Sequence, residues 1–383
     1  MENNTQRRRV RKRKIKKRRR LLFILMPIFI LIGATTAYGV HLYNKADQVV
    51  SDSYEDDGRD KSDLRDKEVD PDVDNVSVLF IGVDESNKRN NEGSSRSDAL
   101  MLATLNKDDK SVKLLSIPRD SYVYIPEVGY NTKINHAHAY GGPKASIEAV
   151  ESLLDIPVDY YVKMDFEAFI DVVDALNGIN VDVPYEMYEQ DSNDKADAIH
   201  LYPGEQSLNG EEALALARTR KQDNDLERGK RQQEIIKAVI KKAANIGSIT
   251  KYDDIMEAVG NNMSTNMRFS EMKSFISYGT SGSLDVETLN LEGQDSMIDG
   301  IYYYQLDETD VANKRIELRN HLELESTDHP GDNVNGNNDY QNESYQSTDE
   351  PTQDGTNGTD SYSDPNQEEQ NNQYDDSDTE STY

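Results

Sequence analysis

The sequence predicts a single α/β domain with a mixed central β-sheet flanked by helices, an N-terminal transmembrane helix and a disordered C-terminal tail. Strand-like and helix-like segments alternate over residues 76–320, which favours one α/β domain over two. Residues 21–40 contain no charge, and the chain after Arg319 contains no Lys or Arg and few aliphatic residues. The predicted parts are a basic segment 1–20, an anchor 21–40, a linker 41–75, a domain 76–320 and a tail 321–383.

The uncharged stretch 21–40 is long enough to cross a bilayer as a helix, since twenty residues span about 30 Å. Twelve Lys or Arg within residues 7–20 precede it and favour a cytoplasmic N-terminus. Small residues at 34–37 leave a cleaved signal peptide as the alternative, but its apolar region is ordinarily about 7 to 15 residues long. We therefore expect an uncleaved single-pass anchor in the cell membrane, with the following domain outside the cell.

The exported part is strongly acidic. After residue 40 the chain has 31 Lys and Arg against 71 Asp and Glu. This balance argues against a nucleic-acid partner, and it means that any anionic ligand needs a local cationic site or a metal ion. The chain has no Cys, so a packed core and not disulfides must stabilise the domain. Such a domain on one anchor suits a Gram-positive envelope.

The linker 41–75 is acidic and poor in apolar residues, and we expect it to space the domain from the membrane. Three apolar segments follow and predict strands over Val76–Val83, Ala99–Leu105 and Val112–Ile117. Residues 122–135 contain Pro and Gly and predict a loop or a short hairpin.

In the rest of the domain, segments with helical spacing of apolar residues alternate with short strand-like apolar segments. Pro143 marks a helix start, and Asn209 is a candidate helix cap. The predicted helices are Pro143–Leu154, Phe166–Leu176, Leu208–Ala217, Leu226–Asn245, Tyr252–Val259, Ser270–Ser277 and Asp307–Leu318. The predicted strands are Val158–Met164, Ile179–Val183, Leu284–Leu291 and Ile301–Leu306. The tail 321–383 cannot bury enough apolar surface to fold.

Charged side chains stand at the ends of the first three strands. Asp84 closes the first, Arg96 and Asp98 open the second, and Arg119 and Asp120 close the third. Ligands of α/β sheets bind where strand ends meet loops, so carboxylates and guanidiniums there indicate a metal and a phosphorylated ligand. The alternative is that these charges only solvate the loop ends of an ordinary sheet.

A second charged group lies further along the chain. In an extended backbone Arg218 and Arg220 point the same way, while Arg228, Arg231 and Gln232 share one face near the start of the long helix. Helix starts favour anions, and Arg binds phosphate oxygens in a bidentate manner. The alternative is that each Arg pairs with a neighbouring acidic residue. A pyrophosphate with a divalent cation would satisfy both charged groups at once.

The motifs together resemble the LytR-CpsA-Psr family over about residues 76–244. The motifs that carry this resemblance are Asp84, Arg96-Ser97-Asp98, Ile117-Pro118-Arg119-Asp120, Lys133-Ile134-Asn135 and Ala217-Arg218-Thr219-Arg220 with Asp225, Arg228 and Arg231-Gln232. The resemblance implies an enzyme that transfers a glycopolymer, such as wall teichoic acid or a capsular chain, from a polyprenyl pyrophosphate carrier to peptidoglycan.

The resemblance also implies roles for single residues. Asp84 and Asp98 look like carboxylates for Mg²⁺ or Mn²⁺, and Arg119, Arg218 and Arg220 look like pyrophosphate ligands. The further contacts would be Arg96, Arg228, Arg231 and Gln232. The residues expected to act in catalysis are Asp84, Asp98, Arg119 and Arg218. A glycan hydroxyl would attack the sugar-linked phosphorus, and Asp84, Asp98 and Asp120 remain alternatives for the general base.

The lipid tail of such a carrier needs a dry groove. Apolar faces on Ile147–Leu154, Phe166–Leu176 and Ile235–Ile240 are candidates, although such faces also form ordinary core. Four tyrosines near the charged loops either stack on sugars or cap the sheet, namely Tyr122, Tyr124, Tyr130 and Tyr140. His136 and His138 are expected to be structural.

Two other functions use the same residues. A metal-dependent phosphatase or pyrophosphatase acting on lipid carriers would employ water as the nucleophile. A binding or regulatory protein of the envelope would need no catalysis, and it predicts that loss of Asp98 or Arg218 leaves function intact.

Overall fold

A computed structural model describes residue 40 and residues 53–84, 95–219, 225–244, 263–280 and 284–324. Except for residue 40, the expected anchor 21–40 lies outside the described residues, as do the expected helix Tyr252–Val259 and the chain from 325 onward. Within the described part, no helix has both the length and the apolarity that a membrane span requires.

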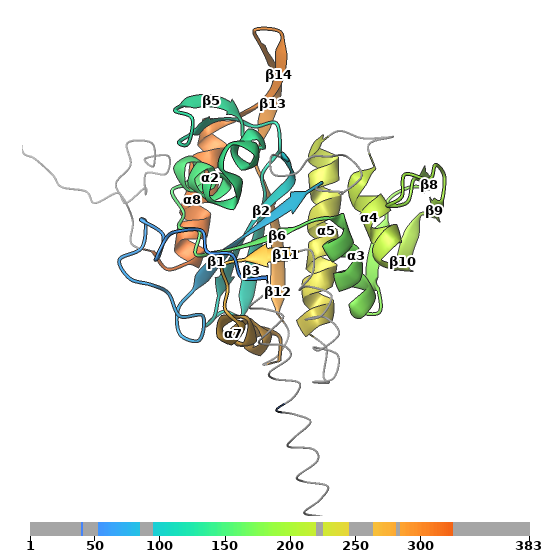
Figure 1. Cartoon of the computed structure of the whole chain (residues 1–383), viewed down its shortest axis with the longest axis horizontal. Coiled ribbons are helices and arrows are strands. Elements are labelled where there is room, and N and C mark those ends of the chain that lie inside the picture. Colours follow the sequence, from blue (N-terminus) through green and yellow to red (C-terminus); the bar gives the residue numbers. More distant parts are fainter. Residues whose placement is uncertain are drawn as a thin grey trace, which may run out of the picture. The chain divides into compact units, whose positions relative to one another are not determined.

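The centre of the domain is a six-stranded sheet with the strand order β11-β6-β1-β2-β3-β12 (Figure 1). Its strands are β1 (Val76–Val83), β2 (Ser97–Asn106), β3 (Ser111–Ser116), β6 (Tyr160–Met164), β11 (Met263–Thr265) and β12 (Asp285–Asn290). β1 runs antiparallel to β2 and parallel to β6, while β12 runs parallel to β3. The prediction of a mixed central sheet in an α/β domain is therefore confirmed.

Alternate residues of the strands build cores on opposite faces of the sheet. On one face Leu79, Ile81 and Val83 pack in the core covered by helices α2 (His136–Leu154) and α8 (Glu308–His321). On the other face the sheet packs against α5 (Asp225–Ala244) and α7 (Phe269–Thr280). All of these side chains lie in segments where the spacing of apolar residues predicts a strand or a helix.

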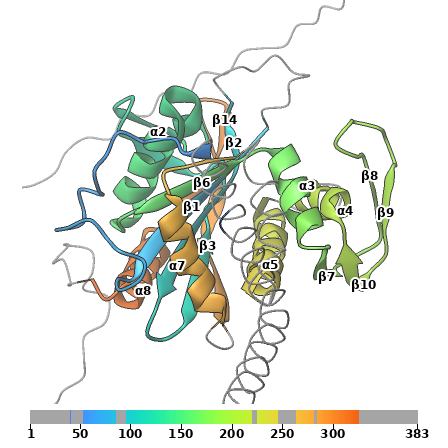
Figure 2. The same ribbon diagram turned by 60° about the horizontal axis from the view of Figure 1, so that its bottom comes forward.

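A second layer lies beyond α5 and has its own core. It contains α3 (Phe166–Ala175), α4 (Gly210–Arg218), the strand pair β7 (Ile179–Val183) and β10 (Gly204–Leu208), and the strand pair β8 (Met187–Glu189) and β9 (Ile199–Leu201). Helix α5 serves both cores, since Ile235 packs in the second layer and Ile236 against the sheet. Figure 2 shows α5 between the sheet and this layer.

Two hairpins stand at the end of the sheet where β1 stops (Figure 1). They are β4 (Tyr122–Ile125) with β5 (Tyr130–Lys133), and β13 (Gly293–Ile298) with β14 (Ile301–Leu306). The backbone N–H of Tyr304 donates to the carbonyl of Asp120 at 2.9 Å and so joins the hairpins. At the turn of the second hairpin, Asp299 and Gly300 have φ values of 52° and 78°, the backbone that a two-residue hairpin turn requires.

The structure departs from the predicted elements at several points. Helix α2 begins at His136, before the predicted start at Pro143, and bends at Gly141 and Gly142. Strands β8 to β11 and β13 were not predicted, because they are short or mostly polar. The expected α3, α4, α5 and α8 are present with ends shifted by a few residues.

The described part of the linker, residues 53–75, is bonded to the domain. Arg65 bonds the Asp159 carboxylate at 2.7 Å, and the Ser62 hydroxyl donates to Glu151 at 2.7 Å. Both partners belong to the domain, and Ser62 is buried. Polar and ionic contacts therefore fix an acidic segment that has few apolar groups to bury.

Candidate active site

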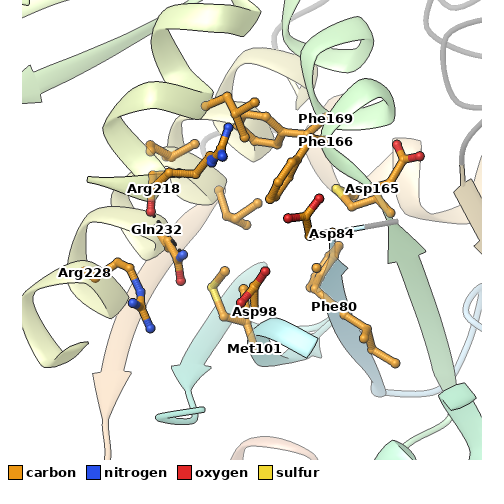
Figure 3. Close-up of a pocket in the computed structure, with 18 residues that line it drawn as sticks. Phe80, Asp84, Asp98, Met101, Asp165, Phe166, Phe169, Arg218, Arg228 and Gln232 are labelled. Carbon is orange, nitrogen blue, oxygen red and sulfur yellow. Dashed lines mark hydrogen bonds between the residues drawn. The ribbon is translucent and has the colours of Figure 1, made fainter. Parts of the chain in front are cut away.

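A cavity of about 300 Å³ lies between the sheet and helices α3, α4 and α5 (Figure 3). Its lining residues are Phe80, Ile81, Gly82, Asp84, Asp98, Ala99, Met101, Met164, Asp165, Phe166, Phe169, Leu214, Ala217, Arg218, Arg228, Gln232, Ile235 and Ile236. The charged and polar members come mainly from strand and helix ends, whereas the apolar members come from within the elements. The cavity therefore joins an apolar interior to a charged margin.

The apolar part follows from the pattern of the surrounding elements. Phe80 and Met101 lie on neighbouring strands and face α5, opposite to the side that packs on α2 and α8. Helix α3 contributes Phe166 and Phe169, and α5 contributes Ile235 among its lining residues. Side chains of this kind give a dry space that suits an aliphatic ligand and not a free anion.

Two carboxylates lie at the end of this apolar space. Asp84 follows β1 directly, and Asp98 is near the start of β2. Because the two strands are antiparallel neighbours, with Gly82 opposite Ala99 and Val83 opposite Ser97, the end of one meets the start of the other. Figure 3 shows both carboxylates at the cavity. The sequence prediction that Asp84 and Asp98 share a site thus agrees with the geometry.

These carboxylates fit a divalent cation that also binds a phosphorylated ligand. Within the described residues, no group of three or more His, Asp or Glu is arranged to hold a metal. Mg²⁺ commonly takes one or two carboxylates and fills its remaining positions with phosphate oxygens and water. Two carboxylates at the cavity are therefore a suitable donor set for a cation that arrives with the ligand.

Arg218 stands on the opposite side of the cavity, at the last residue of α4. The helix starts at a capping box in which the Asn209 side chain accepts from the Glu212 N–H, as the sequence predicts for Asn209. The Arg218 guanidinium lies over the Phe166 ring, 4.6 Å from its centroid. This cation–π contact holds the guanidinium where the apolar wall ends.

Arg228 and Gln232 extend the same side from α5, one helical turn apart. Arg228 is 5% exposed, and the Gln232 amide donates to the Ala217 carbonyl at 3.2 Å, beside Arg218. The helix approaches β3 closely at Gly229, where an added Cβ would lie 2.9 Å from Ser116 Oγ. The glycine therefore permits α5 to bring Arg228 and Gln232 against the strand ends.

Arg119 joins the site through Asp98. Its guanidinium donates to Asp98 Oδ1 at 2.7 Å, and its Nε lies 3.9 Å from Asp120 Oδ1. A smaller pocket adjoins the main cavity, and its lining includes Asp98, Arg119, Arg228 and Gln232. Arg119 thus borders the same charged region without lining the apolar cavity.

Two predicted phosphate ligands, Arg96 and Arg231, do not line the cavity. Arg231 is buried and donates to the carbonyls of Leu216 at 3.1 Å and Thr219 at 2.7 Å. It fastens α5 to the end of α4. The role of Arg231 as a pyrophosphate ligand stays a prediction. Arg96 is exposed and lines neither pocket. Arg220 lies outside the described residues.

Arg96 lies close to residues of α2. Its charge, after the larger effect of burial, lowers the pKa of His136, and it also acts on the Tyr140 hydroxyl. Arg96 therefore lies beside the start of α2. His138 is buried and its Nδ1 is 2.7 Å from the Ser95 carbonyl, in keeping with the structural role expected for it.

Some lining residues were not predicted, and one predicted wall is elsewhere. Asp165 lines the cavity and caps α3, accepting from the Ala168 N–H at 2.8 Å. An Asp before an apolar helix signals the cap but not the cavity. The segment Ile147–Leu154 was a candidate for the apolar groove, but it packs in the core on the other face of the sheet.

Comparison with known proteins gives a consistent result. The model of the LytR_cpsA_psr family matches residues 39–320. The chain is 40% identical over 325 residues to the polyisoprenyl-teichoic acid–peptidoglycan teichoic acid transferase TagT of Bacillus subtilis, a match that covers 84% of this chain and 99% of TagT.

Solved structures show the same fold. The structure of TagT bound to LIIa-WTA matches with a TM-score of 0.61 and 40% identity, over 70% of this chain and 98% of that chain. The structure of YwtF (TagT) with bound octaprenyl pyrophosphate lipid matches with a TM-score of 0.57 and 37% identity, over 70% of this chain and 98% of that chain.

Proposed function

Because the chain belongs to the LytR-CpsA-Psr family, we propose that it transfers an anionic glycopolymer, of the wall teichoic acid or capsular kind, from a polyprenyl pyrophosphate carrier to peptidoglycan. The observation that carries this proposal is a cavity that combines an apolar interior with a charged margin. A polyprenyl pyrophosphate has the same division, with a long hydrocarbon tail and a doubly charged head. Relatives named as teichoic acid transferases, and a relative with bound octaprenyl pyrophosphate, support it.

The two parts of the carrier match two sets of side chains. The prenyl chain fits among Phe80, Met101 and Phe169, where it removes apolar surface from water. The pyrophosphate then lies at the margin, between Asp98 on one side and Arg218 and Arg228 on the other. Guanidiniums in a partly dry site bind phosphate oxygens strongly, because little water competes for them.

The reaction is a phosphoryl transfer. An acceptor hydroxyl forms a bond to the sugar-linked phosphorus, the bond from that phosphorus to the bridging oxygen breaks, and lipid phosphate leaves with the electron pair. The product is a phosphodiester between polymer and acceptor. Negative charge that develops on the leaving and equatorial oxygens is stabilised by Arg218, Arg228 and Arg119. The hydroxyl proton goes to a carboxylate, for which Asp84 and Asp98 at the margin and Asp120 beside Arg119 are the candidates.

Asp84 and Asp98 would hold Mg²⁺ or Mn²⁺ together with the pyrophosphate. A bound cation would neutralise part of the negative charge on the phosphates. Asp98 accepts a hydrogen bond from Arg119, so the carboxylate is oriented before a ligand binds.

We also propose that the protein is a single-pass protein of a Gram-positive cell membrane, with a cytoplasmic N-terminus and an extracellular catalytic domain. The basic cluster before residues 21–40 and the acidic character of the rest support this arrangement. The chain has no Cys, so single introduced cysteines report the topology directly. A membrane-impermeant thiol reagent on whole cells should label Asp72→Cys and not Thr5→Cys. The reverse pattern would contradict the arrangement.

The decisive experiment is a transfer assay with purified protein. Polyprenyl-pyrophosphate-linked polymer, labelled in the sugar, is incubated with and without peptidoglycan, and labelled peptidoglycan and released polymer are both measured. Transfer should need the acceptor and should fall at least 100-fold in Arg218→Ala. Arg268→Ala is the matched control, because Arg268 is exposed and absent from the lining of the cavity.

The other outcomes identify the alternative functions. Release of polymer at the same rate with and without acceptor would show a phosphatase. Binding of carrier without any turnover would show a binding protein, and in that case Arg218→Ala would not change complementation of a null strain.

A further inference from the structure

A group of tyrosines lies on the two hairpins and the start of α2, outside the cavity. Tyr124, Tyr130, Tyr140 and Tyr302 are 48%, 50%, 42% and 37% exposed. With the half-buried Tyr122 they form what we call the tyrosine surface. Exposed aromatic residues gathered on one part of a protein mark a binding surface more often than scattered ones do.

The strands themselves dictate this arrangement. In β4, Val123 and Ile125 are buried in the core, so Tyr122 and Tyr124 face outward on the other side. Lys133 of β5 lies opposite Tyr122, and its Nζ is 5.5 Å from the centroid of the Tyr302 ring. The Tyr122 ring meets the Tyr303 ring edge to face at 4.8 Å. The two hairpins therefore present their rings together.

The start of α2 extends the surface. The Tyr130 and Tyr140 hydroxyls are 3.2 Å apart, and the Tyr140 ring meets His136 edge to face at 6.0 Å. These contacts hold the rings in place before a ligand binds, so less rotamer entropy is lost on binding.

A chain of ion pairs connects this surface to the proposed active site. Asp98 bonds Arg119 at 2.7 Å, Arg119 Nε is 3.9 Å from Asp120, and Asp120 Oδ1 is 3.1 Å from Lys133 Nζ. Lys133 then reaches the Tyr302 ring. The surface thus begins where the pyrophosphate region ends, on the side away from α3 and α4.

The in-line geometry of phosphoryl transfer indicates which substrate this surface binds. In phosphoryl transfer the attacking and leaving oxygens lie roughly in line on opposite sides of phosphorus. In the proposed function the leaving lipid phosphate carries a tail that lies in the cavity between the sheet and α3, α4 and α5. The attacking hydroxyl must then approach from the other side, which the hairpins occupy.

Charge distinguishes the acceptor from the polymer. At the edge formed by α2, the exposed Arg96 follows Ser95, whose carbonyl is 2.7 Å from His138 Nδ1. On the hairpins themselves, 122–133 and 293–306, Lys133 is the only basic residue, and it pairs with Asp120. The same segments carry Glu127, Asp295 and Asp299. A polyanionic polymer is repelled there, whereas an uncharged sugar ring can stack its C–H face on tyrosine.

We propose that the tyrosine surface is the acceptor subsite and binds the amino-sugar backbone of a peptidoglycan strand. This inference rests on the proposed function and deepens it. Tyr124 and Tyr302 hold successive sugars by stacking, and the strand leads one hydroxyl past Lys133 to the phosphorus between Asp98 and Arg218. These tyrosines position the acceptor and take no part in the chemistry.

Kinetics with two varied substrates test the proposal. In Tyr124→Ala/Tyr302→Ala, the KM for peptidoglycan fragments should rise about tenfold or more, from roughly three- to tenfold for each ring. The KM for the lipid-linked donor and the affinity for polyprenyl pyrophosphate alone should not change. Tyr124→Trp/Tyr302→Phe should restore the acceptor KM, because both replacements retain a ring.

Tyr202→Ala is the matched control, since Tyr202 is 58% exposed but lies beyond β9 in the second layer. An unchanged acceptor KM in the double variant, or an equal rise in Tyr202→Ala, would overturn the proposal. Thermal unfolding of each variant shows that the domain remains folded.

Binding of glycan strands from which the stem peptides have been removed, measured without any donor, separates this proposal from the proposed function. Glycan binding that is lost in the double variant supports the subsite even if no transfer is detected, and then only the proposed function fails. Absence of glycan binding to the wild-type chain together with a normal acceptor KM in the variant would reject the subsite and leave the transferase intact.

Discussion

The Arg119 guanidinium donates a hydrogen bond to the Asp98 carboxylate across 2.7 Å and thereby joins the end of β3 to the start of β2. Asp98 also lines the cavity, and both residues border the adjoining pocket. In the proposed function, Asp98 of this pair would face a cation and Arg119 would face phosphate oxygens of the same ligand.

If Asp98 and Arg119 act as one unit, replacing either residue should remove most of the activity that depends on both. We expect Asp98→Asn and Arg119→Met each to lower kcat/KM by about 100-fold and the double variant to fall little further. A double-mutant cycle on the transfer rate measures this coupling. Lys113→Met, which removes an ion pair with Glu287 elsewhere on the sheet, is the control and should change kcat/KM little. Independent, multiplicative losses would show that the two residues serve separate steps.

The contact between Arg218 and Phe166 gives a second prediction. Phe166→Leu keeps an apolar wall but removes the ring under the guanidinium, so kcat/KM should fall about three- to thirtyfold. Phe169→Leu removes a ring from the same wall without that contact and should have a smaller effect. Equal effects of the two variants on the transfer rate would show that only the volume of the wall matters.

The apolar interior should select for the prenyl tail. Met101→Trp adds bulk inside the cavity and should weaken binding of long-chain polyprenyl pyrophosphate by tenfold or more, while inorganic pyrophosphate binds as before. Titration calorimetry with both ligands makes the comparison. Ile236→Phe adds bulk from α5 and should act in the same direction. Equal loss of both ligands would place the tail outside this cavity.

The sequence predicts the sheet well because its strands are continuous apolar segments that end at charge. β1 is found at the predicted residues, and Asp84 and Asp98 are brought together because the two strands are antiparallel neighbours. The pattern of charges does not show where each charged side chain points, however. Arg228, Arg231 and Gln232 share a helix face, yet Arg231 turns to backbone carbonyls of α4.

What could not be predicted depends on contacts between distant segments. Phe80, Phe169 and Ile236 become one cavity only when α3 and α5 pack on the sheet, and each looks like ordinary core in the sequence. Strand β13 is too polar to show an apolar pattern, and β14 fixes it in place by pairing. The tyrosine surface needs both hairpins, which are more than 150 residues apart in the chain.

Removal of divalent cations should abolish transfer if Asp84 and Asp98 hold a cation with the pyrophosphate. We expect EDTA to lower the rate at least 100-fold and added Mg²⁺ or Mn²⁺ to restore it. Asp84→Asn should raise the Mg²⁺ concentration needed for half-maximal rate, because a neutral amide binds the cation more weakly. Asp165→Asn is the matched control, since it lines the same cavity and Asn also caps helices. An Asp84→Asn enzyme with an unchanged Mg²⁺ requirement would remove Asp84 from the cation site.

Stability should depend on pH through His321, which lies at the end of α8 and is 8% exposed. Its Nδ1 is 2.7 Å from Thr104 Oγ1 and its Nε2 is 2.8 Å from Ser111 Oγ. Burial, and next the charge of Lys113, lowers the pKa of the imidazole below its usual value. The weaker opposing charges are those of Asp109, Glu287 and Glu317.

The sign of the effect follows from that lowered pKa. The unfolded chain binds a proton near pH 6.5 and the folded chain only at lower pH, so the stabilisation is complete above about pH 6.5 and is lost as pH falls through the folded pKa. Urea unfolding between pH 8 and pH 5 should show this loss in the wild type and a flatter profile in His321→Gln. His200→Gln, at a 29% exposed side chain, is the control and should keep the wild-type slope. A His321→Gln profile as steep as that of the wild type would assign the pH dependence to other groups.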